Sequence, residues 1–276
     1  MKRRSILFLG ILIFAANFTQ AEQLSPYLII YAFSTEGQLL AKEMTVDSTA
    51  KILGRTIHIG KLSGKDIILA ESGVGMTNAA MTVQGLIDRF HPRAVIFTGI
   101  AGGIDSTVHI GDIVVCRKWA THDYGYWGAE GFKPSPPDVY MPEADSIIEM
   151  AYLMTDSILF DKAAKLALNT FSFDSIGSHI PRLEVGGVGV SGNAFIDNVE
   201  KRQWLSANFG ALVTDMESAA VAQVCTINGV PFIIFRSASD LAGGSGSATA
   251  RTEIGQFFKV AAVNSARVVK EYLKEL

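Results

Sequence analysis

A strand-length apolar run near the C-terminus is followed by residues that could carry chemistry. In the segment PFIIFRSASD, residues 232–235 have the pattern of a buried strand, and Arg236 and Asp240 come after them. An arginine and a carboxylate are costly to bury at such a place unless they are paired or used. Ligands of open α/β sheets bind beyond the carboxyl ends of the strands. Asp240 is therefore the first candidate for chemistry.

Other polar or glycine-rich clusters also follow apolar runs. They are Ser34-Thr35-Glu36, Ser72-Gly73-Val74-Gly75, the TGIAGG turn at 98–103, and Asp215-Met216-Glu217. Glycine turns let a backbone approach a ligand closely, and helix starts present free N–H groups. Taken singly, each cluster has an ordinary explanation as a tight turn or as a charge that complements a helix dipole. Their repetition at strand ends favours one shared site.

The elements that must position these clusters alternate along the chain. Strand-like runs occupy 27–33, 66–70, 94–98, 112–116, 185–190, 212–213 and 232–235. Helical patterns occupy 79–90, 217–224 and 253–276. This alternation predicts an α/β fold with a largely parallel sheet and helices on both faces, a three-layer sandwich.

The chain divides into a leader and one domain. Lys2, Arg3 and Arg4, an apolar stretch at 6–16 and small residues up to Ala21 have the layout of a signal peptide that is cut after Ala21. An uncleaved anchor is the alternative, although the apolar stretch is short for a membrane span. Residues 22–276 fit a single domain. The Pro- and Ser-rich segment 135–181 is interpreted as a peripheral insertion in it.

The composition limits the partners. Hydrophobic residues make up 49% of the chain, which is enough for a sizeable core. The net charge of −3 and the lack of basic clusters after residue 4 argue against nucleic acid as a partner. No later stretch predicts a transmembrane helix, so no membrane contact is expected after cleavage. Cys116 and Cys225 sit in apolar runs and are expected to be unpaired.

Six motifs in order give the chain a resemblance to a known family. They are ESGVGMTNAA, IFTGIAGGI, VHIGDIVV, VSGNAFID, TDMESAAVAQVC and RSASD. Together they resemble the methylthioadenosine/S-adenosylhomocysteine nucleosidase branch of the purine nucleoside phosphorylase superfamily. The resemblance runs from about residue 27 to the C-terminus, apart from the insertion. It implies a nucleoside phosphorylase-like fold with a mixed, largely parallel central sheet. It also implies an N-glycosidase that cleaves 5′-substituted adenosines or related purine nucleosides without a cofactor.

The resemblance assigns roles to individual positions. Asp240 corresponds to the acid that protonates the purine at N7, and Glu36 to the carboxylate that deprotonates the attacking water. Glu217 corresponds to the residue that binds the ribose hydroxyls, with Met216 against the sugar. Phe195 would stack on the base.

Further positions carry supporting roles or depart from the family pattern. The backbone of Ile196 would bind the edge of the base, and Ser72 and Arg236 are expected to support the site. Phe33 stands in the pocket wall where methionine is frequent. Asn193 replaces a usual acidic residue. A Gly/Ser-rich loop, LAGGSGSATA, replaces the usual second acid after the catalytic one.

Three functions remain open at this point. A phosphate-dependent phosphorylase needs a cationic pocket, usually with an arginine. Related phosphorylases place an arginine just before the glycine turn, where this chain has Thr98, and Glu36 in the first loop would repel phosphate. Hydrolysis is therefore favoured. The third reading is a non-catalytic nucleoside-binding or storage protein, which would not need a water-activating carboxylate.

The remaining expectations concern assembly, metals and location. The aromatic segment 122–132 is either a pocket or subunit-interface wall, as in the family, or an ordinary packed loop. The resemblance implies a homodimer or a higher homo-oligomer. The spacing of the five histidines indicates no metal site. The signal peptide predicts a secreted or periplasmic protein.

Overall fold

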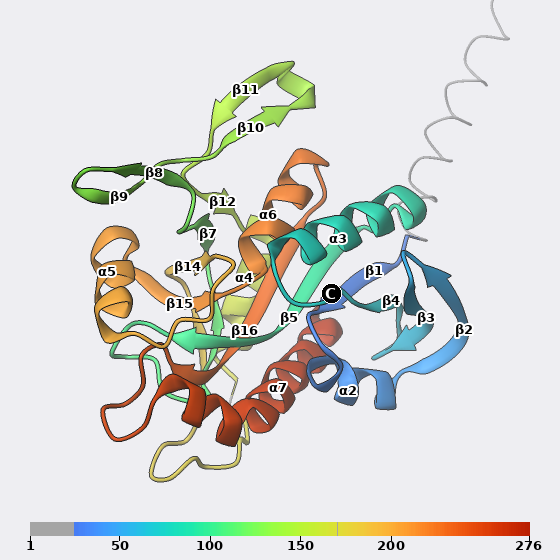
Figure 1. Ribbon diagram of the computed structural model, residues 1–276. Helices are drawn as coiled ribbons and strands as arrows, with labels where there is room; N and C mark the ends of the chain where they lie inside the picture. Colours follow the sequence, from blue (N-terminus) through green and yellow to red (C-terminus); the bar gives the residue numbers. More distant parts are fainter. Residues whose placement is uncertain (1–24, 170) are drawn as a thin grey trace, which may run out of the picture.

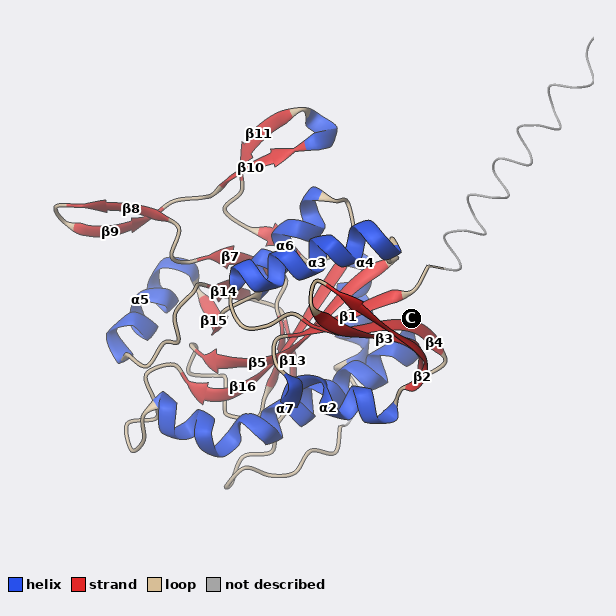
Figure 2. Ribbon diagram, turned by 45° about the vertical axis from the view of Figure 1, so that its right-hand side comes forward, coloured by secondary structure: helices blue, strands red, loops and turns tan. Residues whose placement is uncertain are grey.

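Figure 1 shows the computed structural model of the protein, which describes residues 25–169 and 171–276. The predicted signal peptide lies outside the described residues. Within them, one mixed sheet of twelve strands runs through the molecule, and helices cover both of its faces (Figure 2). The predicted α/β class, a single-domain three-layer sandwich, is confirmed.

The strands of the large sheet follow a mixed order. Along the chain they are β1 (Tyr27–Tyr31), β2 (Thr45–Ile52), β3 (Arg55–Leu62), β4 (Lys65–Glu71), β5 (Ala94–Gly103), β6 (Ile113–Val115), β7 (Lys118–Thr121), β12 (Leu153–Met154), β13 (Leu183–Val185), β14 (Val188–Ser191), β15 (Ala211–Asp215) and β16 (Phe232–Leu241). The order across the sheet is β12-β7-β14-β15-β5-β1-β4-β3-β2, while β16 pairs with β5 and β6, and β13 pairs with β6. β1 and β16 run parallel to β5, whereas β15 runs antiparallel to it.

Two helical layers enclose the sheet. The helices are α2 (Ser34–Glu43), α3 (Met76–Phe90), α4 (Ser157–Leu166), α5 (Val199–Phe209), α6 (Ser218–Ile227) and α7 (Ala250–Glu275), with a short 3₁₀ turn at Pro142–Ala144. α3 and α6 pack on the sheet face that carries Phe97, and α2, α4 and α7 pack on the face that carries Ile96. Because the central strands are buried on both faces, their sequences are continuous apolar runs.

All seven predicted strands are present, with two differences. The run at 185–190 is split because Gly186 and Gly187 have φ values of 142° and 72°, which interrupt the extended chain between β13 and β14. The prediction that Arg236 and Asp240 follow a strand is wrong. β16 continues to Leu241, since β5 and β6 supply it with partners on both sides, and both residues are buried within it.

Several elements had no clear sequence signal. The β2–β3 hairpin is largely exposed and polar, so it lacks an apolar run. Two further hairpins project from the body, β8 (Gly125–Gly128) with β9 (Gly131–Pro134), and β10 (Asp138–Met141) with β11 (Ser146–Glu149) (Figure 1).

The segment 135–181 divides into two parts. Its β10–β11 hairpin stands away from the body, as Figure 1 shows. The following residues join the core, because β12 pairs with β7 and α4 packs its buried side chains against those of α7. The helix α4 begins after Asp156, whose carboxylate caps it by accepting from the Leu159 N–H.

Both cysteines are buried and free. No helix in the described ranges combines the length and apolarity that a bilayer crossing needs.

Candidate active site

A fully buried arginine forms the centre of the site. Arg236 lies in β16 opposite Gly99 of β5, and none of its side chain is exposed. Its guanidinium carbon lies 4.1 Å from the ring centroid of Phe97, over the face of the ring. An Ala in place of Gly99 would put its Cβ into the Arg236 and Glu36 side chains, so the glycine supplies the space for this pair.

Three buried carboxylates surround this guanidinium. Arg236 Nε lies 2.6 Å from Asp215 Oδ2, and Nη2 donates to Glu217 Oε2 at 3.1 Å. Nη1 lies 3.7 Å from the nearer oxygen of Glu36. One positive and up to three negative charges thus share a site with almost no water contact. The cost of desolvating them is offset only by these close pairings.

Asp215 is the best-anchored of the three carboxylates. Besides Arg236, it accepts hydrogen bonds from the Ser191 and Ser218 hydroxyls and from the backbone N–H groups of Glu217 and Ser218. The sequence placed Asp215 in a polar cluster but gave it no role. The signal was its position at the junction of a strand and a helix, directly before Met216 and Glu217.

Glu36 is held by the loop after β1 and by β5. It is the third residue of α2, and its Oε2 accepts from the backbone N–H groups of Ala32 at 2.6 Å and Phe33 at 3.3 Å. Its Oε1 accepts from the N–H of Ile100 at 2.8 Å. The glycine-rich residues 98–103, predicted as a turn, are instead the end of strand β5. They meet the start of α2, which carries Glu36, as the sequence predicted for strand ends.

Burial dominates the electrostatics of Glu36. It raises the pKa of this carboxyl to about 7, although Arg236 and the backbone donors act in the opposite direction. A carboxyl that titrates near neutrality can gain and lose a proton during turnover.

Glu217 bridges three elements. It stands at the start of α6, one of its oxygens accepts from the Gly75 N–H at 2.8 Å, and the other pairs with Arg236. Burial raises its pKa, and Arg236 partly offsets this. The start of α3, the start of α6 and the strand β16 are thereby fixed around one side chain.

A bulge in β16 decides where Asp240 points. Its pairing register with β5 shifts between Ala238 and Asp240, so Asp240 lies opposite Gly102 rather than Gly103. Side chains alternate along a strand, and without the extra residue Asp240 would share the face of Arg236. The bulge places Asp240 on the face of α7 instead. The salt bridges of Arg236 accordingly go to Glu36, Asp215 and Glu217 and not to Asp240.

Asp240 is buried and only partly hydrogen-bonded. Its Oδ2 accepts from the Ser239 hydroxyl at 2.8 Å, while Oδ1 has no hydrogen-bond partner among the described residues. Burial raises its pKa to about 7, against the effect of Ser239, and the charges of Glu253 and Asp197 raise it further. A protonated carboxyl is a hydrogen-bond donor, which is the state an acid catalyst needs.

The Gly/Ser-rich loop after Asp240 is tied to α7 at one side. Glu253 is buried, and its carboxylate accepts from the N–H groups of Leu241 at 2.8 Å and Ser245 at 2.9 Å. At the other end of the loop, Asp197 accepts from the Ala250 N–H at 2.8 Å. These contacts hold the chain that follows the candidate acid.

The other predicted binding residues lie around the same strand ends. Ile196 is buried beneath the loop, whereas Phe195 is 45% exposed and free to meet a ligand. Phe33 packs near Ile100. Met216 lies half-buried between Asp215 and Glu217.

Two predicted or atypical residues support the loops. The Ser72 hydroxyl donates to the carbonyls of Gly73 at 2.9 Å and Tyr31 at 3.3 Å, so it holds the loop after β4. Asn193 uses its side-chain oxygen to accept from the Met76 N–H at 3.1 Å, which joins its loop to the start of α3.

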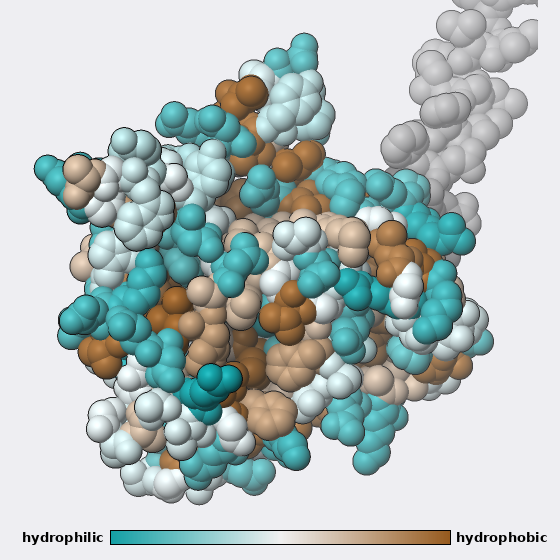
Figure 3. Space-filling model, viewed as in Figure 1, coloured by the Kyte–Doolittle hydropathy of each residue, from teal (hydrophilic) through white to brown (hydrophobic). Residues whose placement is uncertain are grey.

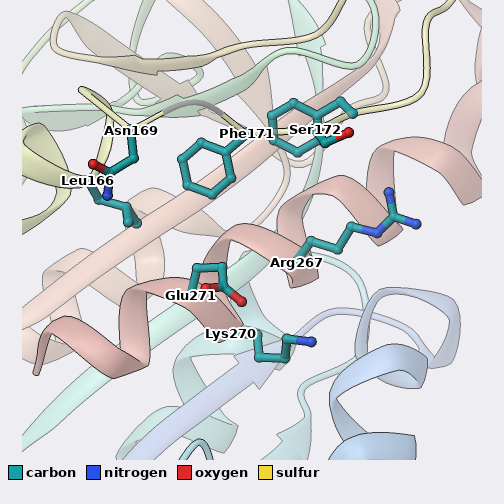
Figure 4. A pocket seen from close by; sticks show the side chains of 8 residues that line it. Leu166, Asn169, Phe171, Ser172, Arg267, Lys270 and Glu271 are labelled. Atoms are coloured by element: carbon teal, nitrogen blue, oxygen red, sulfur yellow. The ribbon is translucent and has the colours of Figure 1, made fainter.

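The surface has an apolar area on one face and a cavity against α7. In the middle of the face seen in Figure 3, apolar side chains gather and hydrophilic ones surround them. A separate cavity of about 390 Å³ lies against α7 and is lined by Leu166, Phe171, Arg267 and Lys270 among others (Figure 4). None of the residues predicted for the site lines this cavity.

Comparison with known proteins agrees with this fold. The family model described as "Phosphorylase superfamily" matches residues 26–274, and this superfamily is the class that the fold and site define. A 5′-methylthioadenosine/S-adenosylhomocysteine nucleosidase of Halalkalibacterium halodurans is 35% identical over 87% of this chain and 94% of its own. The chain therefore belongs to the phosphorylase superfamily and, within it, to the family of these nucleosidases.

Solved structures show the same likeness. The nucleosidase of Neisseria meningitidis, in complex with methylthio-immucillin-A, has a TM-score of 0.75 and 29% identity over 92% of this chain and 100% of its own. The futalosine hydrolase of Helicobacter pylori has a TM-score of 0.75 and 27% identity over 92% of this chain and 99% of its own.

Replacing Arg236 should destabilise the protein in a pH-dependent manner. In Arg236→Met the three carboxylates lose their shared counter-ion, and breaking a buried ion pair typically costs about 3–5 kcal/mol. Urea unfolding should show a loss of this size at pH 7.5. A smaller loss is expected at pH 5, where protonation relieves the repulsion. Arg89→Met, at an exposed position of α3, is the matched control; an equal loss in both variants at both pH values would contradict the role given to Arg236.

Proposed function

We propose that this protein hydrolyses the N-ribosidic bond of 5′-substituted adenosines, such as 5′-methylthioadenosine and S-adenosylhomocysteine, to free base and sugar. The observation that carries the proposal is the pair of buried carboxyls, Asp240 and Glu36, whose pKa values both lie near 7. They are held on opposite sides of β5, beside Gly102 and Gly99. Membership in the nucleosidase family supports the substrate class.

The reaction needs a proton donor for the base and a proton acceptor for water. Protonated Asp240 donates its proton to N7 of the purine as the bond between the base and C1′ breaks. The electron pair of that bond then passes into the ring system. Ionised Glu36 accepts a proton from water as the water oxygen bonds to C1′. This division of labour parallels that of glycosidases, in which one carboxyl protonates the leaving group and the other activates water.

The remaining groups orient the sugar. Glu217 is a strong acceptor for the two ribose hydroxyls, and its contacts with Gly75 and Arg236 fix its position before substrate binds. Such preorganisation means that little reorganisation is required when charge develops at the sugar.

Water is favoured over phosphate as the nucleophile. Arg236 is fully buried and already paired with three carboxylates, so it is not free to bind an anion. Glu36 itself would repel phosphate. The place before the glycine turn is taken by Thr98, whose hydroxyl lies 2.7 Å from that of Ser265.

Substitution of either carboxyl should abolish most of the activity. Asp240→Asn and Glu36→Gln should each lower kcat/KM by about 10²- to 10⁴-fold, the usual contribution of an acid or base. The assay measures free base from methylthioadenosine, S-adenosylhomocysteine, adenosine, inosine and futalosine in phosphate-free buffer. Asp47→Asn, at an exposed position of β2, is the control.

The same assay separates the competing functions. Turnover that requires phosphate and yields a sugar phosphate would identify a phosphorylase. Binding without release of base would identify a nucleoside-binding protein.

The pH dependence should reflect both raised pKa values. kcat/KM should be greatest near pH 7, falling at lower pH as Glu36 is protonated and at higher pH as Asp240 ionises.

The stability of the protein should also depend on the raised pKa of Asp240. A carboxyl whose pKa is raised by folding stabilises the native state most below its unfolded-state pKa, and this stabilisation is lost as the pH rises through its folded-state pKa. Asp240→Asn should therefore unfold at higher urea concentration than wild type at pH 8, and this gain should shrink at pH 5. A gain of the same size at both pH values would argue against a raised pKa.

We also propose that the protein is exported and forms a homodimer. Export is supported by the basic, apolar and small-residue pattern of residues 1–21. Self-association is supported by the β8–β9 hairpin, where Tyr126 and Trp127 are 69% and 76% exposed beside a cavity lined by Phe132 and Trp204. When the full chain is expressed in a Gram-negative host, the protein should appear in the periplasm, and its intact mass should equal that of a chain that begins at Glu22. Light scattering should give twice that mass in solution. An uncleaved cytoplasmic chain or a monomer would refute the respective proposal.

A further inference from the structure

Two histidines from separate segments of the chain and a buried aspartate converge at the start of β6. The side chains of His109, Asp112 and His179 offer ligand atoms that all lie within 4.8 Å of one another. His179 Nε2 lies 2.6 Å from Asp112 Oδ1, and His109 Nδ1 lies 3.6 Å from Asp112 Oδ2. The two imidazole rings are stacked, with centroids 4.4 Å apart. The sequence gave no sign of this cluster because its histidines come from separate segments.

Backbone hydrogen bonds fix the Asp112 carboxylate. Its Oδ2 accepts from the His109 N–H at 2.9 Å, and Oδ1 accepts from the Arg182 N–H at 3.0 Å. The Asp112 N–H in turn donates to the His109 carbonyl at 3.0 Å, which closes a tight turn through Gly111. A side chain on Gly111 would overlap Ile176, so the segment carrying His179 packs directly on this turn.

The distances suit a small divalent cation. In a tetrahedral site with zinc–ligand bonds near 2.0–2.1 Å, neighbouring donors lie about 3.3 Å apart. The distance from His109 Nδ1 to Asp112 Oδ2, 3.6 Å, is close to that value, whereas His179 Nε2 lies 2.6 Å from the other oxygen, Oδ1, and would move apart from it on binding. An ionised carboxylate has about four acceptor positions, and the contacts given above use three of them. The fourth is available on Oδ2, the oxygen nearer to His109.

Charge and access also favour a cation. Asp112 is fully buried, whereas the His109 and His179 side chains are 52% and 26% exposed, so the site opens to solvent on the histidine side. Arg182, whose backbone N–H binds Asp112, pairs its side chain with Glu184 at 2.5 Å, which offsets its charge. With neutral imidazoles, the group keeps the negative charge of Asp112. Two histidines and one carboxylate with an open position for water are a donor set that zinc accepts.

We propose that His109, Asp112 and His179 form a binding site for a divalent transition-metal cation of the zinc type, distinct from the candidate active site. On binding, the neutral imidazoles take the tautomers that leave a lone pair on His179 Nε2 and on His109 Nδ1, with their protons on the other ring nitrogens. The contact of His109 Nδ1 with the Thr107 carbonyl, 3.1 Å, is then given up. The site would tie the segment around His179 to the central sheet, because the backbone of Asp112 is hydrogen-bonded to Ala238 of β16 at 2.8 Å.

Zinc titration of the purified protein tests the proposal. The full chain is prepared without a polyhistidine tag, stripped with a chelator, dialysed, and titrated with zinc chloride by calorimetry at pH 7.5. One zinc ion per chain is expected. His109→Gln and His179→Gln should each weaken binding about tenfold or more, since loss of even an indirect partner of a metal site typically costs 10- to 100-fold. His58→Gln and His91→Gln, which alter histidines outside the cluster, are the controls and should bind as wild type does.

Two results would overturn the site. One is the lack of binding to wild type at 100-fold excess of zinc over protein, and the other is unchanged binding in both cluster variants. The outcome does not depend on the proposed hydrolase activity, because the readout is heat of binding. The cluster variants His109→Gln and His179→Gln should also keep the nucleosidase turnover of wild type in metal-free buffer, which checks that they fold.

Discussion

The buried guanidinium of Arg236 is the interaction on which the rest of the site depends. It lies in a low-dielectric environment, where an unpaired charge would be prohibitively costly, and it makes possible the burial of Asp215, Glu217 and Glu36. Glu36 comes from one segment of the chain, and Asp215 and Glu217 come from another, the junction of β15 and α6. The ion cluster therefore joins the start of α2, the start of α6 and the strand β16, and it draws in the start of α3 through Glu217. Its members differ in strength of pairing, from the tight contact with Asp215 to the looser one with Glu36.

The different distances of the carboxylates from Arg236 affect their chemistry. Asp215 accepts four hydrogen bonds and pairs most closely with Arg236, which suits a residue that anchors the site. Glu36 is the farthest of the three from the guanidinium, so burial outweighs attraction and its pKa rises to about 7. The same cation thus pairs closely with one carboxylate and more loosely with another, whose raised pKa lets it exchange protons.

Much of this arrangement could be predicted from the sequence. Continuous apolar runs identified the buried strands, and Glu36, Glu217, Arg236 and Asp240 were singled out because they stood at or near the ends of such runs. What the sequence could not reveal depends on contacts between distant segments. The polar β2–β3 hairpin is stabilised by strand pairing and not by an apolar pattern. The role of Asp215 follows from its distance to Arg236, and the meeting of His109 with His179 follows from the packing of a loop on Gly111.

The irregularity in β16 has a wider consequence. By inserting one residue between Ala238 and Asp240, it assigns the two proposed tasks of the site to opposite layers of the sandwich. The group for the sugar is built on α6 and α3, while the surroundings of the acid are built on α7 and its preceding loop. The two layers can accumulate substitutions separately. A descendant of this chain could therefore accept a different base while the residues that bind the ribose stay unchanged. A single extra residue in β16 thus separates the part of the site proposed to bind the sugar from the part proposed to protonate the base.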